Sequence, residues 1–255
     1  MARLAGRVAL VSGGGTGIGR ATARAICSDG GAVVVMGRRA PKLEAVVTEI
    51  REAGGRGTAF VGDVRNEEDV TSAVDTAVNA YGGLDIVVHC AGERAKGGVQ
   101  ETTPATWDSI MTTNLRGAFL LAREAAQKMR AGGSIVNVSS IASIRTFRDS
   151  LAYSVSKAGL NMLTQCVALE LSAKTIRVNA VLPGIILGTD AAHRVPGLAS
   201  YLADGEAMAN AHPIGRAGTT EEIAGLIVFL CSAEASWVTG ALYTIDGGRS
   251  LLSAR

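Results

Sequence analysis

Cysteine is scarce in this sequence, and the four cysteines that occur are far apart. Cys27, Cys90, Cys166 and Cys231 form no Cys-x-x-Cys pair and no cluster with histidine. This spacing supports neither a metal site nor a disulfide framework. We therefore expect all four residues to be free thiols in a reducing cytosol.

Runs of one charge and long apolar runs are missing as well. The formal net charge is +2 and the basic residues are scattered, so no cluster indicates nucleic acid or an anionic membrane as a partner. The first apolar stretch, Val8–Val11, is too short for a signal peptide, and no run approaches the length of a membrane span. We expect a soluble cytoplasmic protein.

Hydrophobic residues and glycine, in contrast, are abundant. Hydrophobic residues make up 47% of the 255 residues and charged residues 19%, which is typical of a globular protein with a large core. The 32 glycines are spread among apolar runs, against only 5 prolines, and this distribution indicates many tight turns between strands and helices.

Short apolar runs rich in β-branched residues alternate with longer helical patterns. Runs that are apolar throughout are typical of strands covered by helices on both faces. The alternation predicts one α/β domain over residues 1–255, with a doubly wound, Rossmann-like parallel sheet of about seven strands. The predicted strands are Val8–Val11, Ala32–Met36, Thr58–Val61, Leu84–His89, Ser134–Ser139, Ile176–Leu182 and Ala241–Ile245. The predicted helices span 17–29, 40–53, 66–81, 104–130, 151–173 and 219–232.

Two segments stand out from this rhythm. The connection from Gly184 to Pro213 is longer than most, and such connections in compact domains are usually functional lids or disordered. The stretch Asn114–Met129 is apolar nearly all round. It therefore fits either deep burial within the domain or a subunit interface.

A glycine-rich turn follows the first predicted strand and precedes a helix. It contains Gly13, Gly17 and Gly19 in the spacing GxxxGxG. Glycine permits a sharp turn and a close approach of the backbone to a pyrophosphate, and the helix N-terminus supplies N–H groups and a positive dipole end. A plain turn gives the same string, but its place between a strand and a helix predicts a dinucleotide site.

The residues after the second and third strands bear on the choice of dinucleotide. The second strand ends at Arg38 and Arg39, without the acidic residue that would bind the ribose of NAD. Guanidiniums can hold a 2′-phosphate, so we expect NADP to be preferred over NAD, with Arg38 as the main contact, unless both arginines are merely solvated. Asp63 could accept from the adenine amino group or cap a turn.

Tyr153 and Lys157 are four residues apart in a predicted helix, which puts them on one face. An ammonium stabilises a phenolate, so we expect Lys157 to lower the pKa of the Tyr153 phenol towards the working pH. Such a phenol can exchange a proton with an alkoxide while hydride is transferred. Ser139 and Ser140 end the preceding strand, where a hydroxyl could hold the substrate oxygen or simply form a turn.

Together these motifs resemble the short-chain dehydrogenase/reductase family, in its compact single-domain branch. The resemblance covers essentially the whole chain, and the motifs occur in the family's order and spacing. The other segments that carry it are Asp63-Val64, Ala91-Gly92, Asn114-Leu115, Tyr153-Ser154-Val155-Ser156-Lys157, Asn179-Ala180-Val181-Leu182-Pro183-Gly184 and Asp246-Gly247-Gly248.

The resemblance implies a catalytic tetrad and a homotetramer built partly through the two long central helices. Tyr153 is the implied acid and base, and Lys157 binds the nicotinamide ribose. Ser140 polarises the substrate carbonyl, since the family's serine lies at this distance before the tyrosine, and Asn114 holds a water that links Lys157 to solvent. The implied cofactor-binding residues are Gly13, Gly15, Thr16, Gly17, Ile18, Gly19, Arg38, Arg39, Asp63, Val64, Ala91, Gly92, Tyr153, Lys157, Pro183, Gly184 and Ile186.

Two positions depart from the family's pattern. His89 and Cys90 stand where the family usually has two asparagines, so we expect altered local hydrogen bonding and a structural rather than catalytic role for His89. The threonine that contacts the nicotinamide carboxamide comes later than usual, at Thr189.

The substrate pocket is predicted from residues 93–98, 141–151 and 185–212. Arg145 and Arg148 could meet an anionic substrate there or be only solvated. Lys128, Arg130 and Lys174 occupy places that resemble the basic surface by which 3-oxoacyl-carrier-protein reductases meet an acyl carrier protein, although helix C-termini favour such residues anyway.

These observations predict an oxidoreductase for a small carbonyl or secondary alcohol, with a 3-oxoacyl thioester as one candidate. An NAD-linked alcohol, sugar or steroid dehydrogenase is the alternative, because fold does not fix the substrate. A regulatory protein with a dead site is a third reading, against which the intact tetrad argues. We discount an extended-branch epimerase or dehydratase, which needs an added C-terminal domain.

Overall fold

The computed structural model describes residues 2–189, 200 and 203–252. One parallel sheet of seven strands runs through it in the order β3-β2-β1-β4-β5-β6-β7, so the strand order reverses between β1 and β4. This confirms the predicted doubly wound fold. The strands are β1 (Val8–Ser12), β2 (Ala32–Gly37), β3 (Arg56–Val61), β4 (Leu84–His89), β5 (Met129–Val138), β6 (Arg177–Pro183) and β7 (Leu242–Ile245).

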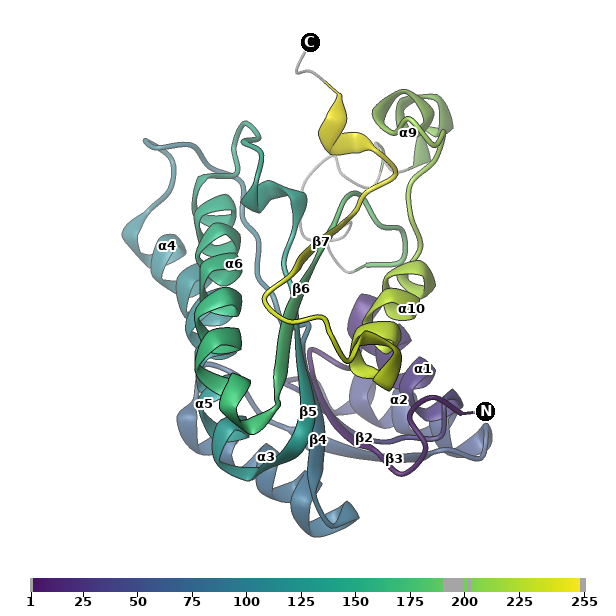
Figure 1. The fold of residues 1–255 in the computed structure, drawn as a ribbon. Helices are drawn as coiled ribbons and strands as arrows, with labels where there is room; N and C mark the ends of the chain where they lie inside the picture. The colour runs from purple at the N-terminus through teal and green to yellow at the C-terminus, as the bar shows by residue number, and fades with distance from the viewer. Residues whose placement is uncertain (1, 190–199, 201–202, 253–255) are drawn as a thin grey trace.

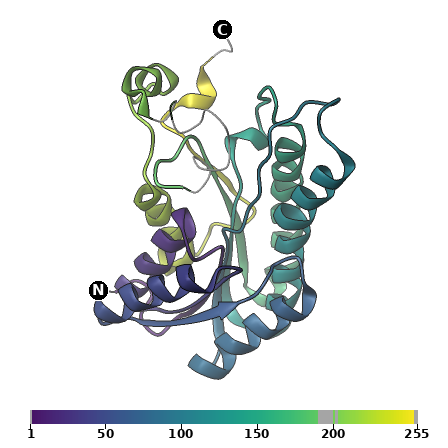
Figure 2. The ribbon, with the colours of Figure 1, turned by 180° about the vertical axis from the view of Figure 1, so that it is seen from behind.

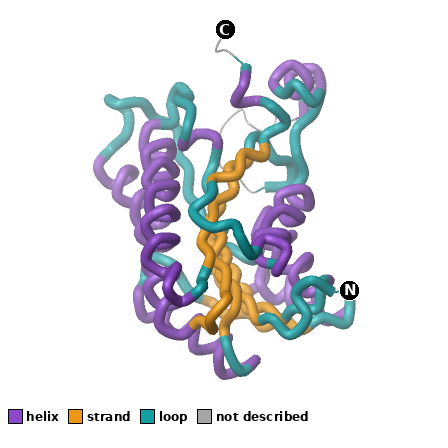
Figure 3. Tube along the Cα trace, viewed as in Figure 1, coloured by secondary structure: helices purple, strands orange, loops and turns teal. Residues whose placement is uncertain are grey.

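Helices cover both faces of the sheet, as Figures 1 and 2 show from opposite sides. One face carries α1 (Gly17–Ser28), α2 (Ala40–Glu52) and α10 (Thr220–Cys231). The other carries α3 (Glu67–Tyr81), α5 (Gly117–Lys128) and α6 (Leu151–Leu171). In Figure 3 the strands form a central layer between these two groups. The shorter helices are α4 (Pro104–Met111) and α9 (Gly205–Ala211).

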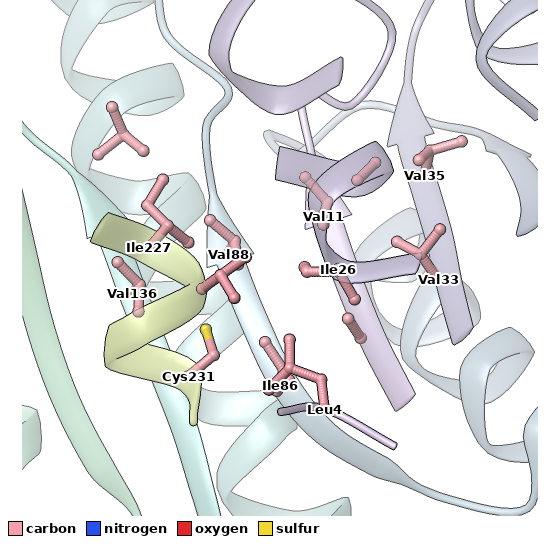
Figure 4. Close-up of a cluster of buried hydrophobic side chains, with 14 of the residues drawn as sticks. Leu4, Val11, Ile26, Val33, Val35, Ile86, Val88, Val136, Ile227 and Cys231 are labelled. Atoms are coloured by element: carbon pink, nitrogen blue, oxygen red, sulfur yellow. The ribbon is translucent and has the colours of Figure 1, made fainter. Parts of the chain in front are cut away.

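The core consists of two apolar layers, one on each side of the sheet. Ala9 and Val11 of β1 pack with α1, α2 and α10, whereas Val8 and Leu10 pack with α3 and α5. Figure 4 shows the first of these layers, with Ile26 and Ile227 beside the strand residues. Alternate strand residues thus enter opposite layers, which explains why the strand segments are apolar throughout.

The single helix predicted over 104–130 is in fact three elements. A π-helical turn, Thr112–Arg116, separates α4 from α5 and contains the buried Asn114. The strand predicted from Ser134 begins earlier, at Met129, and its pairing with β4 is irregular between Leu84 and Ile86. The backbone becomes extended at Met129, where the helix ends, and the strand continues through two glycines.

The predicted long connection from Gly184 to Pro213 is only partly described. Ile186 pairs with Gly218 through an isolated bridge, and α9 follows nearer its end. Residues 190–199 and 201–202, which belong to the predicted substrate pocket, lie outside the described residues. Within the described parts of the chain, no helix is long and apolar enough to cross a membrane.

Candidate active site

A cleft of about 350 Å³ lies at the carboxyl ends of the strands, where the strand order reverses. All the residues predicted to bind the cofactor line this cleft, and so do Ser139 and Ser140. Asn114 does not line it. The structure therefore brings together in one place segments that follow β1, β2, β3, β4, β5 and β6.

The glycine-rich turn forms one wall of the cleft. Gly13 has a φ of +66°, and a Cβ there would come within 2.7 Å of the backbone nitrogen of Ala91. Thr16 is the N-cap of α1, but its side chain makes no capping hydrogen bond. The free N–H groups at the start of α1 thus remain available to a ligand in the cleft. This backbone fits a pyrophosphate.

A basic region lies at the end of the cleft beyond β2. Arg38, Arg39 and Lys42 all line it, and the Nη2 atom of Arg39 is 3.4 Å from the Thr16 hydroxyl oxygen. Sequence reasoning missed Lys42, although a third cation within one helical turn of two arginines was a usable signal. Three cations without an acidic residue after β2 fit a phosphate group on the ribose.

Asp63 lines the same end of the cleft, but its carboxylate is engaged by Arg65. Arg65 donates to it from the backbone at 3.0 Å and from the guanidinium at 2.9 and 2.6 Å. Burial alone would raise the pKa of Asp63, but Arg65 and the charge of Arg38 bring it below its ordinary value. Asp63 therefore caps a turn, as one of the two predicted roles requires. An adenine amino group that bound to Asp63 would have to share a carboxylate that already accepts from Arg65.

Tyr153 and Lys157 lie on the first turns of α6, facing the cleft. The Lys157 ammonium lies 5.7 Å from the centroid of the Tyr153 ring and donates to the carbonyl of Val138 at 2.8 Å. Burial lowers the pKa of Lys157 to about 8. Both residues share one helix face, as the four-residue spacing predicts.

The direction predicted for the pKa of Tyr153 is wrong in this structure. Burial raises the pKa of the Tyr153 phenol, while the Ser140 hydroxyl and the charge of Arg94 oppose the rise. Loss of water contact penalises the phenolate more than the neighbouring groups stabilise it. Arg94, which no motif indicated, lies with its guanidinium carbon 5.4 Å from the Tyr153 ring centroid.

The two serines at the end of β5 have different partners. Ser139 is buried and donates to the carbonyl of Lys157 at 3.2 Å, which ties β5 to α6. Ser140 caps the following 3-10 turn by accepting from the backbone N–H of Ala142 at 3.1 Å. The hydroxyl of Ser140 therefore still has its proton to donate, whereas that of Ser139 is used within the chain.

Asn114 is fully buried and holds the chain after β4 against α6. Its side-chain oxygen accepts from the backbone N–H of Glu93 at 2.7 Å, and its amide donates to the Glu93 carbonyl and the Ser156 hydroxyl, both at 2.9 Å. A Cβ placed on Gly92 would lie 3.7 Å from this oxygen and 3.8 Å from Lys157 Nζ. Asn114 thus lies just behind the cleft, close to Lys157.

The structure shows the contacts of His89 and Thr189, which lie at the two positions that depart from the family's pattern. His89 is buried, with Nδ1 bonded to the Ser12 hydroxyl at 3.0 Å, and burial and the Lys157 charge lower its pKa to about 3. A neutral imidazole thus joins β4 to β1. Thr189 lines the cleft, packs near Gly17, and donates to the carbonyl of Ile186 at 3.4 Å.

The basic residues considered for substrate or carrier binding mostly have partners within the chain. Arg145 donates to the carbonyls of Ser250 and Leu252 near the C-terminus. Lys128 pairs with Asp75, Arg130 with Asp85 at 3.0 Å, and Lys174 donates to the carbonyl of Ala126 at 2.7 Å. These side chains have structural uses that need no ligand.

Comparison with known proteins gives matches over nearly the whole chain. A family model described as enoyl-(acyl carrier protein) reductase matches residues 13–250. The chain is 40% identical to a cis-4-hydroxycyclohexanecarboxylate dehydrogenase of Sinomonas cyclohexanicum, over 95% of this chain and 96% of that protein. It is 34% identical to a 3-oxoacyl-[acyl-carrier-protein] reductase of Thermotoga maritima, over 96% and 98%.

Comparison with solved structures also gives a match over nearly the whole chain. A dehydrogenase/reductase from Sinorhizobium meliloti 1021 superposes with a TM-score of 0.90 and 38% identity, covering 97% of this chain and 96% of that one. The chain belongs to the short-chain dehydrogenase/reductase family. It is therefore an oxidoreductase of alcohol and ketone groups that uses a nicotinamide cofactor and acts on small molecules.

Proposed function

We propose that this short-chain dehydrogenase/reductase is an NADP(H)-dependent enzyme that interconverts a ketone and a secondary alcohol, with Tyr153 as its acid and base. The observation that carries the proposal is the composition of one cleft. Ser140, Tyr153 and Lys157 lie in it together with the glycine-rich turn and three cations.

The residues present fit the dinucleotide along the whole cleft. The α1 N-terminus and the turn at Gly13 would hold the pyrophosphate, and Arg38, Arg39 and Lys42 would hold the 2′-phosphate. Pro183, Gly184 and Ile186 would border the nicotinamide, which supplies or accepts the hydride when the cofactor is bound.

The protein's own part in the reaction is to orient the substrate and to move one proton. Ser140 donates a hydrogen bond to the substrate oxygen and fixes it near the Tyr153 hydroxyl. Because burial raises the pKa of Tyr153, its phenol stays protonated at neutral pH and can protonate the alkoxide that forms during reduction. Lys157 holds positive charge beside the phenolate that remains.

The cofactor preference is tested by comparing kcat/KM for NADPH and NADH. We expect wild type to favour NADPH by about ten- to a hundredfold, the worth of one or two charge-assisted hydrogen bonds. Arg38→Asp should shift this ratio towards NADH by a similar factor. Arg24→Asp, on α1 outside the cleft, is the matched control and should leave the ratio in place. An unchanged ratio in Arg38→Asp would contradict the arginine argument.

Two substrate classes remain for the assay. The Thermotoga relative's name suggests a 3-oxoacyl thioester, and the Sinomonas relative's name suggests a ring alcohol. Lys128, Arg130 and Lys174 already have partners within the chain, so an acyl carrier protein is the weaker candidate partner. Turnover of a short 3-oxoacyl thioester with NADPH would favour the first class, and its absence would favour ring ketones and other alcohols.

We also propose a homotetramer assembled partly through α5 and α6. Val155, Met162 and Leu169 recur every seventh residue along α6 and are 40, 60 and 78% exposed. Phe119 of α5 is 45% exposed, whereas its neighbours Leu120 and Leu121 are buried. Both interpretations of the apolar stretch 114–129, burial within the domain and a subunit interface, thus have support. One side of α5 packs in the core, and the other exposes the ring of Phe119.

A further inference from the structure

Arg94 borders the part of the cleft in which the substrate must lie. It belongs to the loop after β4 and lines the cleft together with Ser140 and Tyr153. Its guanidinium carbon is 5.4 Å from the centroid of the Tyr153 ring. The carbonyl that reacts has to lie within hydrogen-bonding distance of the Tyr153 hydroxyl, so the rest of the substrate comes close to Arg94.

Within the part of the chain that the structure describes, the charge of Arg94 has no acidic partner. Among the described residues, none forms an ion pair or hydrogen bond with its guanidinium. The adjacent Glu93 also lines the cleft, but its carboxylate accepts from the hydroxyls of Ser109 at 2.9 Å and Thr113 at 3.2 Å rather than from Arg94. Arg145, in contrast, is already bonded to carbonyls near the C-terminus.

A guanidinium in this setting suits an anionic ligand. Its planar array of donors matches a carboxylate bidentately, and the contact with the Tyr153 ring favours one placement of this otherwise exposed side chain. A charge-assisted hydrogen bond of this kind raises affinity by about ten- to a hundredfold. The proposed reaction makes no use of the guanidinium donors of Arg94, so they are available to another group of the substrate.

We propose that Arg94 binds an anionic group of the substrate, so that the preferred substrate is a small ketone or secondary alcohol that carries a carboxylate. This inference rests on the proposed function, because it names the substrate class of the same site. The Arg94 guanidinium carbon lies 5.4 Å from the Tyr153 ring centroid, so a small substrate can reach the phenol with its carbonyl and the guanidinium with its carboxylate.

The test compares keto acids with uncharged amides of the same shape. One pair is 4-oxopentanoate and 4-oxopentanamide, and the other is 4-oxocyclohexanecarboxylate and its carboxamide. With NADPH, wild type should show a kcat/KM at least tenfold higher for the acid of a pair than for the amide. Arg94→Ala should abolish this preference, mainly through KM for the acid, and Arg94→Lys should retain part of it.

Lys96→Ala is the matched control. Lys96 is an exposed cation two residues further along the same loop, and it is not among the described residues that line the cleft. Its removal should leave the acid-to-amide ratio at the wild-type value. If Arg94→Ala changes this ratio no more than Lys96→Ala does, Arg94 has no part in substrate recognition.

A purely electrostatic role of Arg94 on Tyr153 gives a different result. Arg94 lowers the pKa of the Tyr153 phenol, so its removal raises that pKa. The pH profile would then move equally for the acid and the amide, and their ratio would stay the same. The ratio therefore separates recognition of the substrate from tuning of the phenol.

Calorimetry with pentanoate and cyclohexanecarboxylate tests the inference without turnover. The NADPH complex of wild type should bind at least one of these non-reducible acids at least tenfold more tightly than the Arg94→Ala complex does. If no ketone is reduced but an acid binds through Arg94, the proposed reaction fails and the anion site stands. Reduction of the amides without any acid binding would overturn the anion site and leave the reaction standing.

Discussion

Tyr153 is partly buried and has three polar neighbours, of which Ser140 and Arg94 affect its pKa. Burial raises the pKa of the phenol, Ser140 and Arg94 lower it, and Lys157 lies over the ring. Tyr153→Phe removes only the hydroxyl and should keep the shape of the cleft. We expect NADPH affinity to stay within about threefold, while kcat falls by at least ~10²-fold, because the variant loses the proposed proton donor.

Fluorescence titration with NADPH and steady-state kinetics measure these two effects separately. Tyr81→Phe is the control, because Tyr81 also loses a bonded hydroxyl but lies on α3, where it contacts Thr58 at 2.9 Å. Wild-type turnover in Tyr153→Phe would remove this residue from its proposed role.

Lys157 gives the reduction reaction an expected pH dependence. Burial lowers its pKa to about 8, so the ammonium is present below that pH and is lost as the pH rises through it. The phenol, with its pKa raised, stays protonated over the same range. We expect kcat/KM for ketone reduction to be flat below about pH 7 and to fall above about pH 8.

A profile from about pH 6 to about pH 10, in buffers of constant ionic strength, measures this dependence. Cofactor affinity is followed at each pH, since Lys157 is also expected to hold the ribose. A rate that stays level to the alkaline end of the range would mean that the charge on Lys157 does not support the reaction.

Among single residues of the site, those that belong to motifs could be predicted from the sequence, whereas those outside motifs were missed. Tyr153 and Lys157 follow from their spacing on one helix face, and the family resemblance selected Ser140 from the two serines at the strand end. Arg94 and Lys42 lie in the cleft for reasons of tertiary packing that no local pattern reports. The pKa direction of Tyr153 was also out of reach, since burial decides it.

Among the helices and strands, the π-helical turn Thr112–Arg116 gives the clearest prediction for the free energy of unfolding. It places Asn114 where one side chain satisfies both backbone groups of Glu93 and bonds to Ser156. Asn114→Ala leaves buried polar groups without partners, so we expect a loss of about 2–3 kcal/mol in the free energy of unfolding. Turnover should also fall, because the loop that carries Arg94 loses its anchor.

Urea unfolding followed by circular dichroism gives the change in stability. Asn66→Ala is the control, since Asn66 caps α3 at the surface by accepting from the N–H groups of Glu68 and Asp69. Its loss should cost about 1 kcal/mol and leave turnover unchanged. Equal destabilisation in the two variants would show that the buried hydrogen bonds of Asn114 contribute no more to the free energy of unfolding than the surface helix cap of Asn66 does.

Most element positions could be predicted, and the misses share a cause. Apolar runs located all seven strands, because both faces of each strand pack against helices. The break between α4 and α5 was not predicted, since one extra residue in a helical turn barely disturbs an apolar pattern. The polar run Thr112–Asn114, between the apolar Met111 and Leu115, could have indicated it.

For the whole molecule, the exposed apolar face of α6 leads to a prediction on assembly. Leu169, 78% exposed, lies in line with Met162 and Val155. Leu169→Lys would place a charge within the proposed interface, where its desolvation is unfavourable. We expect wild type to sediment as a tetramer and the variant to dissociate into smaller species at micromolar concentration.

Analytical ultracentrifugation over a range of concentrations measures this difference. Val99→Lys is the control, because Val99 is 82% exposed but lies in the loop before α4, away from α6. Identical sedimentation of wild type and Leu169→Lys would exclude α6 from the interface, whatever the oligomeric state.

The packing of α10 against α1 also constrains how the chain is made. Ile223 and Ile227 of α10 share one apolar layer with Ala23 and Ile26 of α1. During synthesis, α1 (Gly17–Ser28) is complete long before α10 (Thr220–Cys231) has been made. The strands β1 and β2 and the helix α2 also pack against α1, but the part of its apolar side that α10 covers stays exposed until α10 emerges, and exposed apolar surface of this kind favours aggregation and chaperone binding.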